Sequence, residues 1–235
     1  MSRRYAFPTL LLLLLLLPSI STRAQSTDRV QLESEIVSLR EQLKLKERQF
    51  LSPSAEDRAA FAEFLSQPET GLIRLLPGEK YQRKLTIVGG GAYYSFARLT
   101  QEYGGGSDIE LQKDQLSVGF AGADFGYLVM LGDVPLETVT LATDGAAFLN
   151  EFTPPSREPE ARTQQRVANE GFKHGKFTYQ NRLPARVGQT YVVRSVNYDR
   201  ADTLVAFRVI RQDSDGSLIL LWKMLRKYPT PPLTD

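Results

Sequence analysis

The chain has 235 residues, with 29 Lys and Arg against 27 Asp and Glu, one histidine and no cysteine. This length suits one ordinary domain, or one domain with an appendage. The formal charge of +2 is too small for the clustered basic excess of a nucleic-acid-binding protein, so we expect no nucleic acid as partner. The lack of cysteine excludes disulfides, thiol nucleophiles and cysteine-ligated metals, and a single histidine excludes multi-histidine sites. We therefore expect neither a metal nor a cofactor.

Residues 1–24 have the layout of a secretory signal peptide. Arg3 and Arg4 precede an apolar stretch that includes eight consecutive leucines, and small residues stand at the −3 and −1 positions before a cleavage point after Ala24. The apolar stretch is shorter than the roughly 20 residues of a spanning helix, which favours cleavage over an uncleaved membrane anchor. Both alternatives place the remaining chain outside the cytoplasm, in the periplasm or the medium.

Removal of this leader takes away three arginines and no acidic residue, so the net charge changes from +2 to −1. The chain after Ala24 also has no cysteine to form a disulfide and no Asn-x-Ser/Thr glycosylation site. Small exported eukaryotic domains usually contain disulfides. We therefore expect bacterial export.

Residues 25–51 are predicted to form an amphipathic or short coiled-coil helix, running from Ser26 to Phe50 with Asp28 as its cap. The spacing of its apolar residues alternates between four and three, which is the a/d pattern of a coiled coil. In that register Glu35 (g) and Arg40 (the next e) attract each other in a parallel dimer. The pattern predicts a homo-oligomer through residues 28–50; the alternative is a helix lying on its own domain. The predicted assembly residues are Leu32, Ile36, Leu39, Leu43 and Phe50, with Lys46 at one core position.

Residues 52–71 are predicted to hold a second helix and a linker. Leu51, Ser52 and Pro53 interrupt the first helix, and a new one is expected from Ser54 to Gln67. Ser54 would cap it with Asp57 three residues on, and Pro68 would end it.

Residues 72–228 are predicted to form a β-rich domain, because apolar residues begin to alternate and glycine-rich breaks recur every eight to twelve residues. The fold class is therefore mainly β: an antiparallel β sandwich or barrel-like domain preceded by two N-terminal helices, α+β overall. A short helix is expected from Asp144, as its cap, to Leu149. A polar loop is expected at 153–171, with helical turns from Pro159 to Asn169. The strands expected before these segments are 82–88, 92–99, 108–112, 115–121, 127–131 and 137–141.

The C-terminal third carries the clearest pattern. Strands at 189–198, 203–211 and 217–227 are separated by short turns, which force an antiparallel meander. The last strand is apolar on both faces, so we expect it to be central and covered on both sides. Residues 229–235 form a proline-rich tail.

Candidate binding residues lie beside the glycine runs. Gly89, Gly90 and Gly91 lack the lysine of a phosphate-binding loop, and aromatic residues follow them. Glycine beside aromatic rings can serve a flat partner such as a sugar ring, or can reflect ordinary β-core packing. The candidate ligand-binding residues are Tyr93, Tyr94, Phe96, Tyr103, Asp108 and Asp124. No catalytic residue is assigned, and His174 is expected to be exposed.

The sequence contains no complete catalytic motif. The preferred hypothesis is an exported, non-catalytic binding or scaffolding protein of the bacterial cell envelope, with an envelope protein or a polysaccharide as partner. One alternative is a carboxylate-based, glycosidase-like envelope hydrolase, because carboxylates are the only plentiful catalytic groups. A minor alternative is a small outer-membrane β-barrel, although several predicted strands are too short for it.

Overall fold

The computed structural model describes residues 21–104 and 106–235. It divides into two units that meet between Lys46 and Glu47, and we describe each by itself. The predicted leader, residues 1–24, lies outside the described residues except for 21–24. These four residues belong to the first helix.

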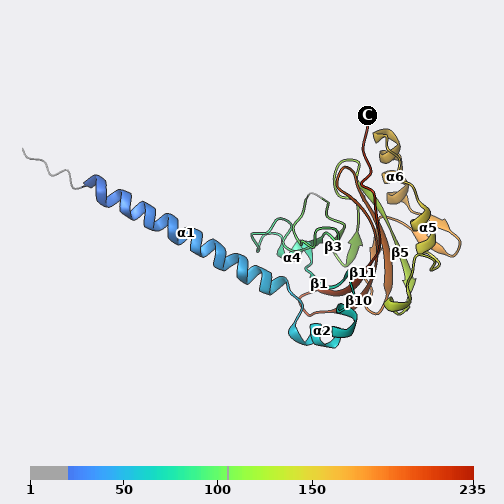
Figure 1. Cartoon of the computed structure of the whole chain (residues 1–235), viewed down its shortest axis with the longest axis horizontal. Coiled ribbons are helices and arrows are strands. Elements are labelled where there is room, and N and C mark those ends of the chain that lie inside the picture. Colours follow the sequence, from blue (N-terminus) through green and yellow to red (C-terminus); the bar gives the residue numbers. More distant parts are fainter. Residues whose placement is uncertain (1–20, 105) are drawn as a thin grey trace, which may run out of the picture. The chain divides into compact units, whose positions relative to one another are not determined.

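Helix α1 covers Ser21–Leu51, the first of which is also the first described residue, so the helix extends to the N-terminal side of Ser26 (Figure 1). Asp28 therefore lies inside the helix and is not its cap, and the first turn contains no acidic residue. The reason is that residues 21–27 hold neither proline nor glycine, so nothing in them stops the helix from extending backwards.

Helices α2 (Ala55–Ala60) and α3 (Ala62–Leu65) replace the single predicted helix 54–67. The predicted cap is confirmed: the Ser54 side chain accepts from the amide of Asp57, whose carboxylate accepts from the amide of Ser54. The break falls at Phe61, where φ is −111°. This bend lets Phe64 of α3 enter the core.

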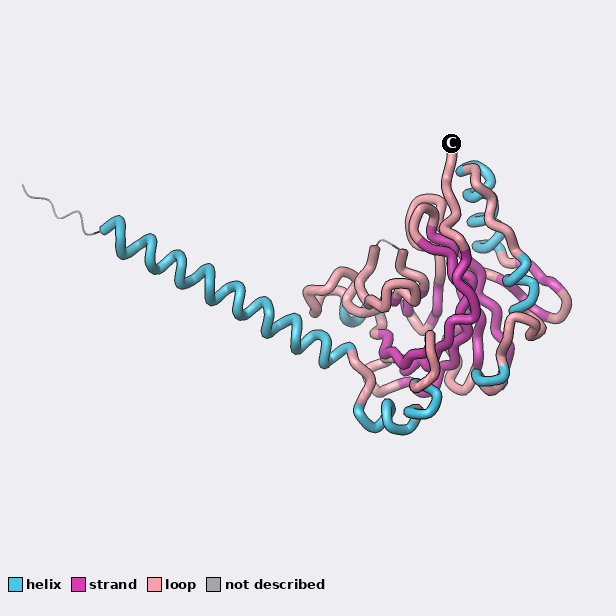
Figure 2. The backbone as a smooth tube through the Cα atoms, viewed as in Figure 1, coloured by secondary structure: helices cyan, strands magenta, loops and turns pink. Residues whose placement is uncertain are grey.

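A five-stranded antiparallel sheet forms the centre of the domain (Figures 1 and 2). Its order is β1-β11-β10-β9-β5, so the first strand of the domain pairs with the last. The predicted meander is confirmed, since β10 pairs with both β9 and β11. The strand bounds are β1 Thr70–Leu75, β5 Phe125–Gly132, β9 Thr190–Asn197, β10 Ala201–Gln212 and β11 Leu218–Tyr228.

Both faces of this sheet are covered, as the alternating pattern of β11 predicts. Ile219 and Leu221 join one core with Phe64, while Leu220 and Trp222 join a second core with Phe96. Helices α5 (Ala146–Glu151) and α6 (Glu158–Glu170) lie on the side of the first core. A four-stranded sheet of order β2-β3-β4-β8 packs on the other side. Its strands are β2 Tyr93–Tyr94, β3 Ile109–Gln112, β4 Gln115–Ser117 and β8 Arg182–Pro184.

Smaller elements complete the domain. They are α4 (Gly78–Tyr81), a 3-10 turn at Leu136–Thr138, and the hairpin of β6 (Phe172–His174) with β7 (Phe177–Tyr179). The polar stretch 153–171 contains α6, in agreement with the predicted helical turns. The cap of α5 is Gly145 rather than the predicted Asp144. The tail is pinned to the start of α6 by hydrogen bonds between Thr234 and the backbone of Ser156 and Glu158.

Two predicted strands are wrong, and two others, 92–99 and 115–121, are shorter than expected. Residues 115–121 form a strand only over β4. Residues 82–88 form turns, because the backbone of Lys84 and Leu85 bonds to Tyr81 and the amide of Thr86 donates to the Glu47 carboxylate. Residues 137–141 begin in the 3-10 turn, where Thr138 bonds back to Pro135. Of residues 92–99, only β2 and a bridge at Ser95 are extended.

The C-terminal turn of α1 belongs to the second unit and is held by it. The carboxylate of Glu47 accepts from both the amide and the hydroxyl of Thr86, and Arg74 donates to the carbonyl of Phe50 at 2.7 Å. Leu51 is buried, and a Cβ on Gly91 would lie 2.3 Å from its Cδ2 atom. The glycine run 89–91 therefore leaves room for the end of this helix.

Candidate functional site

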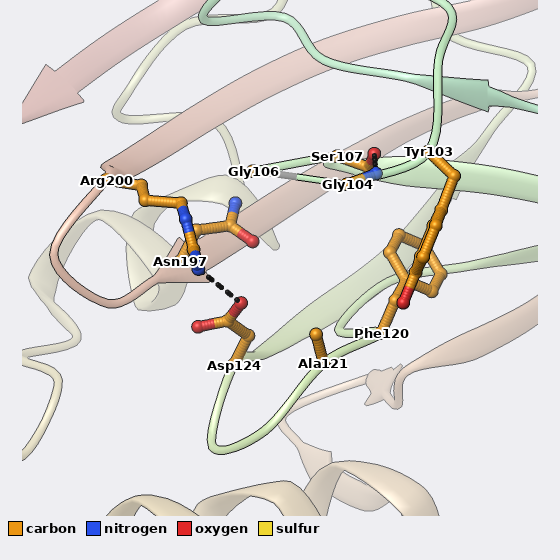
Figure 3. Close-up of a pocket in the computed structure, with 9 residues that line it drawn as sticks. All are labelled: Tyr103, Gly104, Gly106, Ser107, Phe120, Ala121, Asp124, Asn197 and Arg200. Carbon is orange, nitrogen blue, oxygen red and sulfur yellow. Dashed lines mark hydrogen bonds and ion pairs between the residues drawn. The ribbon is translucent and has the colours of Figure 1, made fainter. Parts of the chain in front are cut away.

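A small hollow of about 50 Å³ lies where three loops of the domain meet (Figure 3). The loops are the segment around Ser107, the segment from Phe120 to Asp124, and the turn that follows β9. We call it the Asp124 hollow. Its lining residues are Tyr103, Gly104, Gly106, Ser107, Phe120, Ala121, Asp124, Asn197 and Arg200.

The turn after β9 places the polar wall of the hollow. Asn197 is the last residue of β9, and Asp199 has a positive φ of 58°, which reverses the chain into β10. The amide of Tyr198 donates to Oδ1 of Asp124 at 2.9 Å, and Nη1 of Arg200 lies 3.7 Å from Oδ2. Burial raises the pKa of Asp124, while the Tyr198 amide and the Arg200 charge oppose that shift.

A buried carboxylate behind the hollow orients Asn197. Asp108 is fully buried and accepts from the amide of Phe96 at 2.7 Å and from Nδ2 of Asn197 at 3.0 Å. Because a carboxylate accepts hydrogen bonds, the amide nitrogen of Asn197 must face Asp108. Its oxygen then turns to the hollow, where it accepts from no described residue (Figure 3).

Removal from water also changes the acidity of this carboxylate. Burial raises the pKa of Asp108 to about 6, against hydrogen bonds from Ser195 and from the amide of Phe96 that lower it. Asp108 thus connects the loop before β3 with the end of β9 through its hydrogen bond to Asn197. Because it is fully buried, it cannot contact a ligand in the hollow directly.

Aromatic rings form the opposite wall. Tyr103 is 40% exposed, and Tyr93 packs behind it with ring centroids 4.9 Å apart. Tyr93 also meets the ring of Phe120 edge-on at 5.3 Å. The hydroxyl of Tyr93 donates to Glu110 at 2.7 Å, which fixes the ring. A rigid, partly exposed aromatic surface therefore faces the Asp124 carboxylate.

The structure separates the six predicted binding residues into three groups. Tyr103 and Asp124 line the hollow, whereas Tyr93 and Asp108 lie one contact behind its walls. Tyr94 and Phe96 lie in the core instead, where the Phe96 ring packs on Trp222 at 5.3 Å.

Sequence reasoning missed five lining side chains. These are Ser107, Phe120, Ala121, Asn197 and Arg200. Asn197 lies near the end of the predicted strand 189–198, and Arg200 lies in the short turn that follows it, which was the only signal available for them. Nothing in the spacing connects that turn with residues far earlier in the chain.

The chemistry of the hollow is that of hydrogen bonding. Its unfilled acceptors are the Asn197 oxygen and the Asp124 carboxylate, and the guanidinium of Arg200 is its charged donor. Asp124 is the one carboxylate among its lining side chains. Within the described ranges, no three His, Asp or Glu side chains gather as metal ligands.

Comparisons with protein-family models, with curated proteins and with solved structures find no match. Among residues 21–104 and 106–235, no helix has both the length and the apolar composition needed to cross a bilayer. His174 is exposed, as expected, and its ring packs on Phe148 at 4.6 Å.

Proposed function

We propose that this chain is an exported, non-catalytic binding protein of the bacterial cell envelope whose β domain binds polysaccharide. The observation that carries the proposal is the Asp124 hollow, in which a partly exposed aromatic ring faces hydrogen-bonding groups with unfilled capacity. Sugars combine an apolar ring face with rows of hydroxyls, and they are held by such pairs of surfaces.

The size of the hollow defines what enters it. A volume of about 50 Å³ is enough for a hydroxyl-bearing group or for ordered water, and it is too small for a whole sugar ring. In the proposed complex a sugar ring lies on Tyr103. One or two of its hydroxyls reach into the hollow and donate to Asp124 and Asn197.

Export is supported by the sequence alone. The arginines, the leucine run and the small residues before Gln25 form the layout of a cleavable leader. An N-terminal sequence read from the protein recovered after expression in a bacterial host tests this: it should begin at Gln25. An intact N-terminus in the cytoplasmic fraction would contradict export.

Calorimetry with chitohexaose and cellohexaose tests the binding. Asp124→Asn keeps the acceptor for the Tyr198 amide but removes the charge, so affinity for the bound sugar should fall about tenfold or more, the cost of losing one charged hydrogen bond. Tyr103→Ala should lower it similarly, because the ring face is lost.

Asp144→Asn is the matched control for Asp124→Asn. Its side chain is 80% exposed and lies outside the hollow, so its affinity should equal that of the unchanged protein. Equal binding by the Asp124, Tyr103 and Asp144 variants, or no binding of either hexasaccharide, would contradict the proposal.

The glycosidase-like alternative gains no support from the hollow. Retaining and inverting hydrolases both need two carboxyl groups beside the scissile bond, about 5 to 10 Å apart. Asp124 is the one carboxylate that lines the hollow, and the nearby Asp108 is fully buried. Release of shorter sugars from either hexasaccharide would favour the hydrolase over a binding protein.

A further inference from the structure

Helix α1 carries a stripe of exposed apolar side chains. Leu32, Ile36, Leu39 and Leu43 are between 44% and 63% exposed, and we call these four residues the α1 stripe. Their spacing of four, three and four residues places them on one side of the helix. Within the described part of the first unit there is one helix, and one helix cannot cover its own apolar stripe.

Three of the four stripe residues, Ile36, Leu32 and Leu39, have the residue types that favour one kind of partner. In the heptad register that includes Lys46 as a d residue, Ile36 and Leu43 occupy a positions and Leu32 and Leu39 occupy d positions. A β-branched residue at a with leucine at d favours two strands in parallel dimers. The geometry points to a second copy of this chain as the occupant: we infer that two α1 helices pair in parallel and in register through the stripe.

Charges beside the stripe support this orientation. Glu35 is at a g position and Arg40 is at the next e position, so each Glu35 meets Arg40 of the other chain when the helices are parallel. Within one helix, Glu35 accepts from Gln31 at 3.1 Å, one turn away, which leaves its charge without a cationic partner among the described residues. The pairing would supply that cation twice in each dimer.

Two residues, Lys46 and Phe50, show where the paired region ends on its C-terminal side. Lys46 occupies the d position that follows Leu43, which weakens the core there. Phe50, which the sequence assigns to assembly, packs in the second unit against Tyr81 at 5.5 Å and beneath the guanidinium of Arg74. The paired segment is therefore residues 32–43 rather than 28–50.

Cysteine cross-linking tests the orientation, because the chain has no cysteine of its own. Leu39→Cys should give a disulfide-linked dimer under a glutathione redox buffer, since d residues of the two chains face each other in a parallel dimer. Val37→Cys is the matched control, as Val37 is 54% exposed on the same helix but outside the stripe, and it should give little dimer. A mixture of Leu32→Cys and Leu43→Cys chains should give few mixed dimers.

Sedimentation of the full-length chain tests the assembly itself. Leu39→Gln should weaken association about 100-fold or more, because two leucines leave the contact in each dimer, whereas Val37→Gln should have little effect. Mixing Glu35→Arg chains with Arg40→Glu chains should produce heterodimers in preference to either homodimer. Substitution is preferable to truncation here, because Glu47 and Leu51 of the same helix are buried in the second unit.

The possible outcomes separate the parts of the inference. A monomer at all concentrations, with no disulfide at position 39, would overturn the pairing while leaving the sugar-binding proposal intact. Efficient mixed dimers of the Leu32 and Leu43 variants, with none at position 39, would overturn the parallel orientation. Equal effects of Leu39→Gln and Val37→Gln would show that the α1 stripe is not the contact.

Discussion

Asp108 gives the domain a pH dependence of its own. Its folded pKa of about 6 lies above the 3.8 of an aspartate in water, because burial disfavours the charged form. The folded state therefore holds the proton more tightly than the unfolded state between these two values. It follows that this residue makes the free energy of unfolding fall as pH rises from about 4 to about 6, by about 2–3 kcal/mol in all.

Urea unfolding of the unchanged protein and of Asp108→Asn, from pH 4 to pH 7, measures this contribution. The free energy of unfolding of the unchanged protein minus that of Asp108→Asn should decline up to about pH 6 and then stay constant. Asp57 acts in the opposite sense only at lower pH, because Arg211 lowers its pKa to about 2. A difference that does not change with pH would show that Asp108 does not titrate in this range.

A second charge, Arg194, lies fully inside the protein. Arg194 and Asp202 are each 1% exposed and share two hydrogen bonds, and Arg194 also donates to the carbonyl of Leu149. Asp202→Asn leaves the guanidinium without its counter-charge and should lower the free energy of unfolding by about 3–5 kcal/mol. The double variant Arg194→Met, Asp202→Leu should lose much less free energy of unfolding, because it leaves no charge unpaired. Urea unfolding of the two single variants and the double variant measures this, and additive losses would contradict the pairing.

At the scale of elements, the loop at 89–91 depends on close backbone approach. Gly90 has φ of 59°, and a Cβ there would lie 2.6 Å from the backbone of Gln82. Gly122 has the same φ but open space around it. Both Ala variants carry a left-handed cost of about 1–2 kcal/mol, and Gly90→Ala should lose a further ~1–3 kcal/mol through overpacking. Thermal unfolding of the two variants measures the difference, and equal losses would contradict this contact.

Elements were predictable where one local pattern decided them. The meander of β9, β10 and β11 follows from alternation and short turns, and the capping box at Ser54 follows from residue type. Residues 82–88 have a strand-like composition, but the backbone amides of Lys84 and Leu85 bond to Tyr81 and that of Thr86 bonds to the distant Glu47. The conformation of this segment therefore depends on a contact with another element, the end of α1, and the local sequence does not reveal that contact.

At the scale of the whole molecule, the two covered faces of the central sheet were predictable from β11, and the composition of the hollow was not. Tyr103 and Asp124, which line it, were identified by residue type together with their place beside a glycine run or a strand end. Asn197 joins them only because Asp108, which precedes it by 89 residues, binds and turns its amide. Long-range hydrogen bonds of this kind leave no periodic trace in a sequence.

The pairing of β1 with β11 has a kinetic consequence. Thr70 lies opposite Lys223, so the edge strand cannot find its partner until almost the whole chain has been made. Loop closure over such a separation is slow, and sheets built from distant segments fold late. The central sheet is therefore completed only when the first and last strands of the domain have come together.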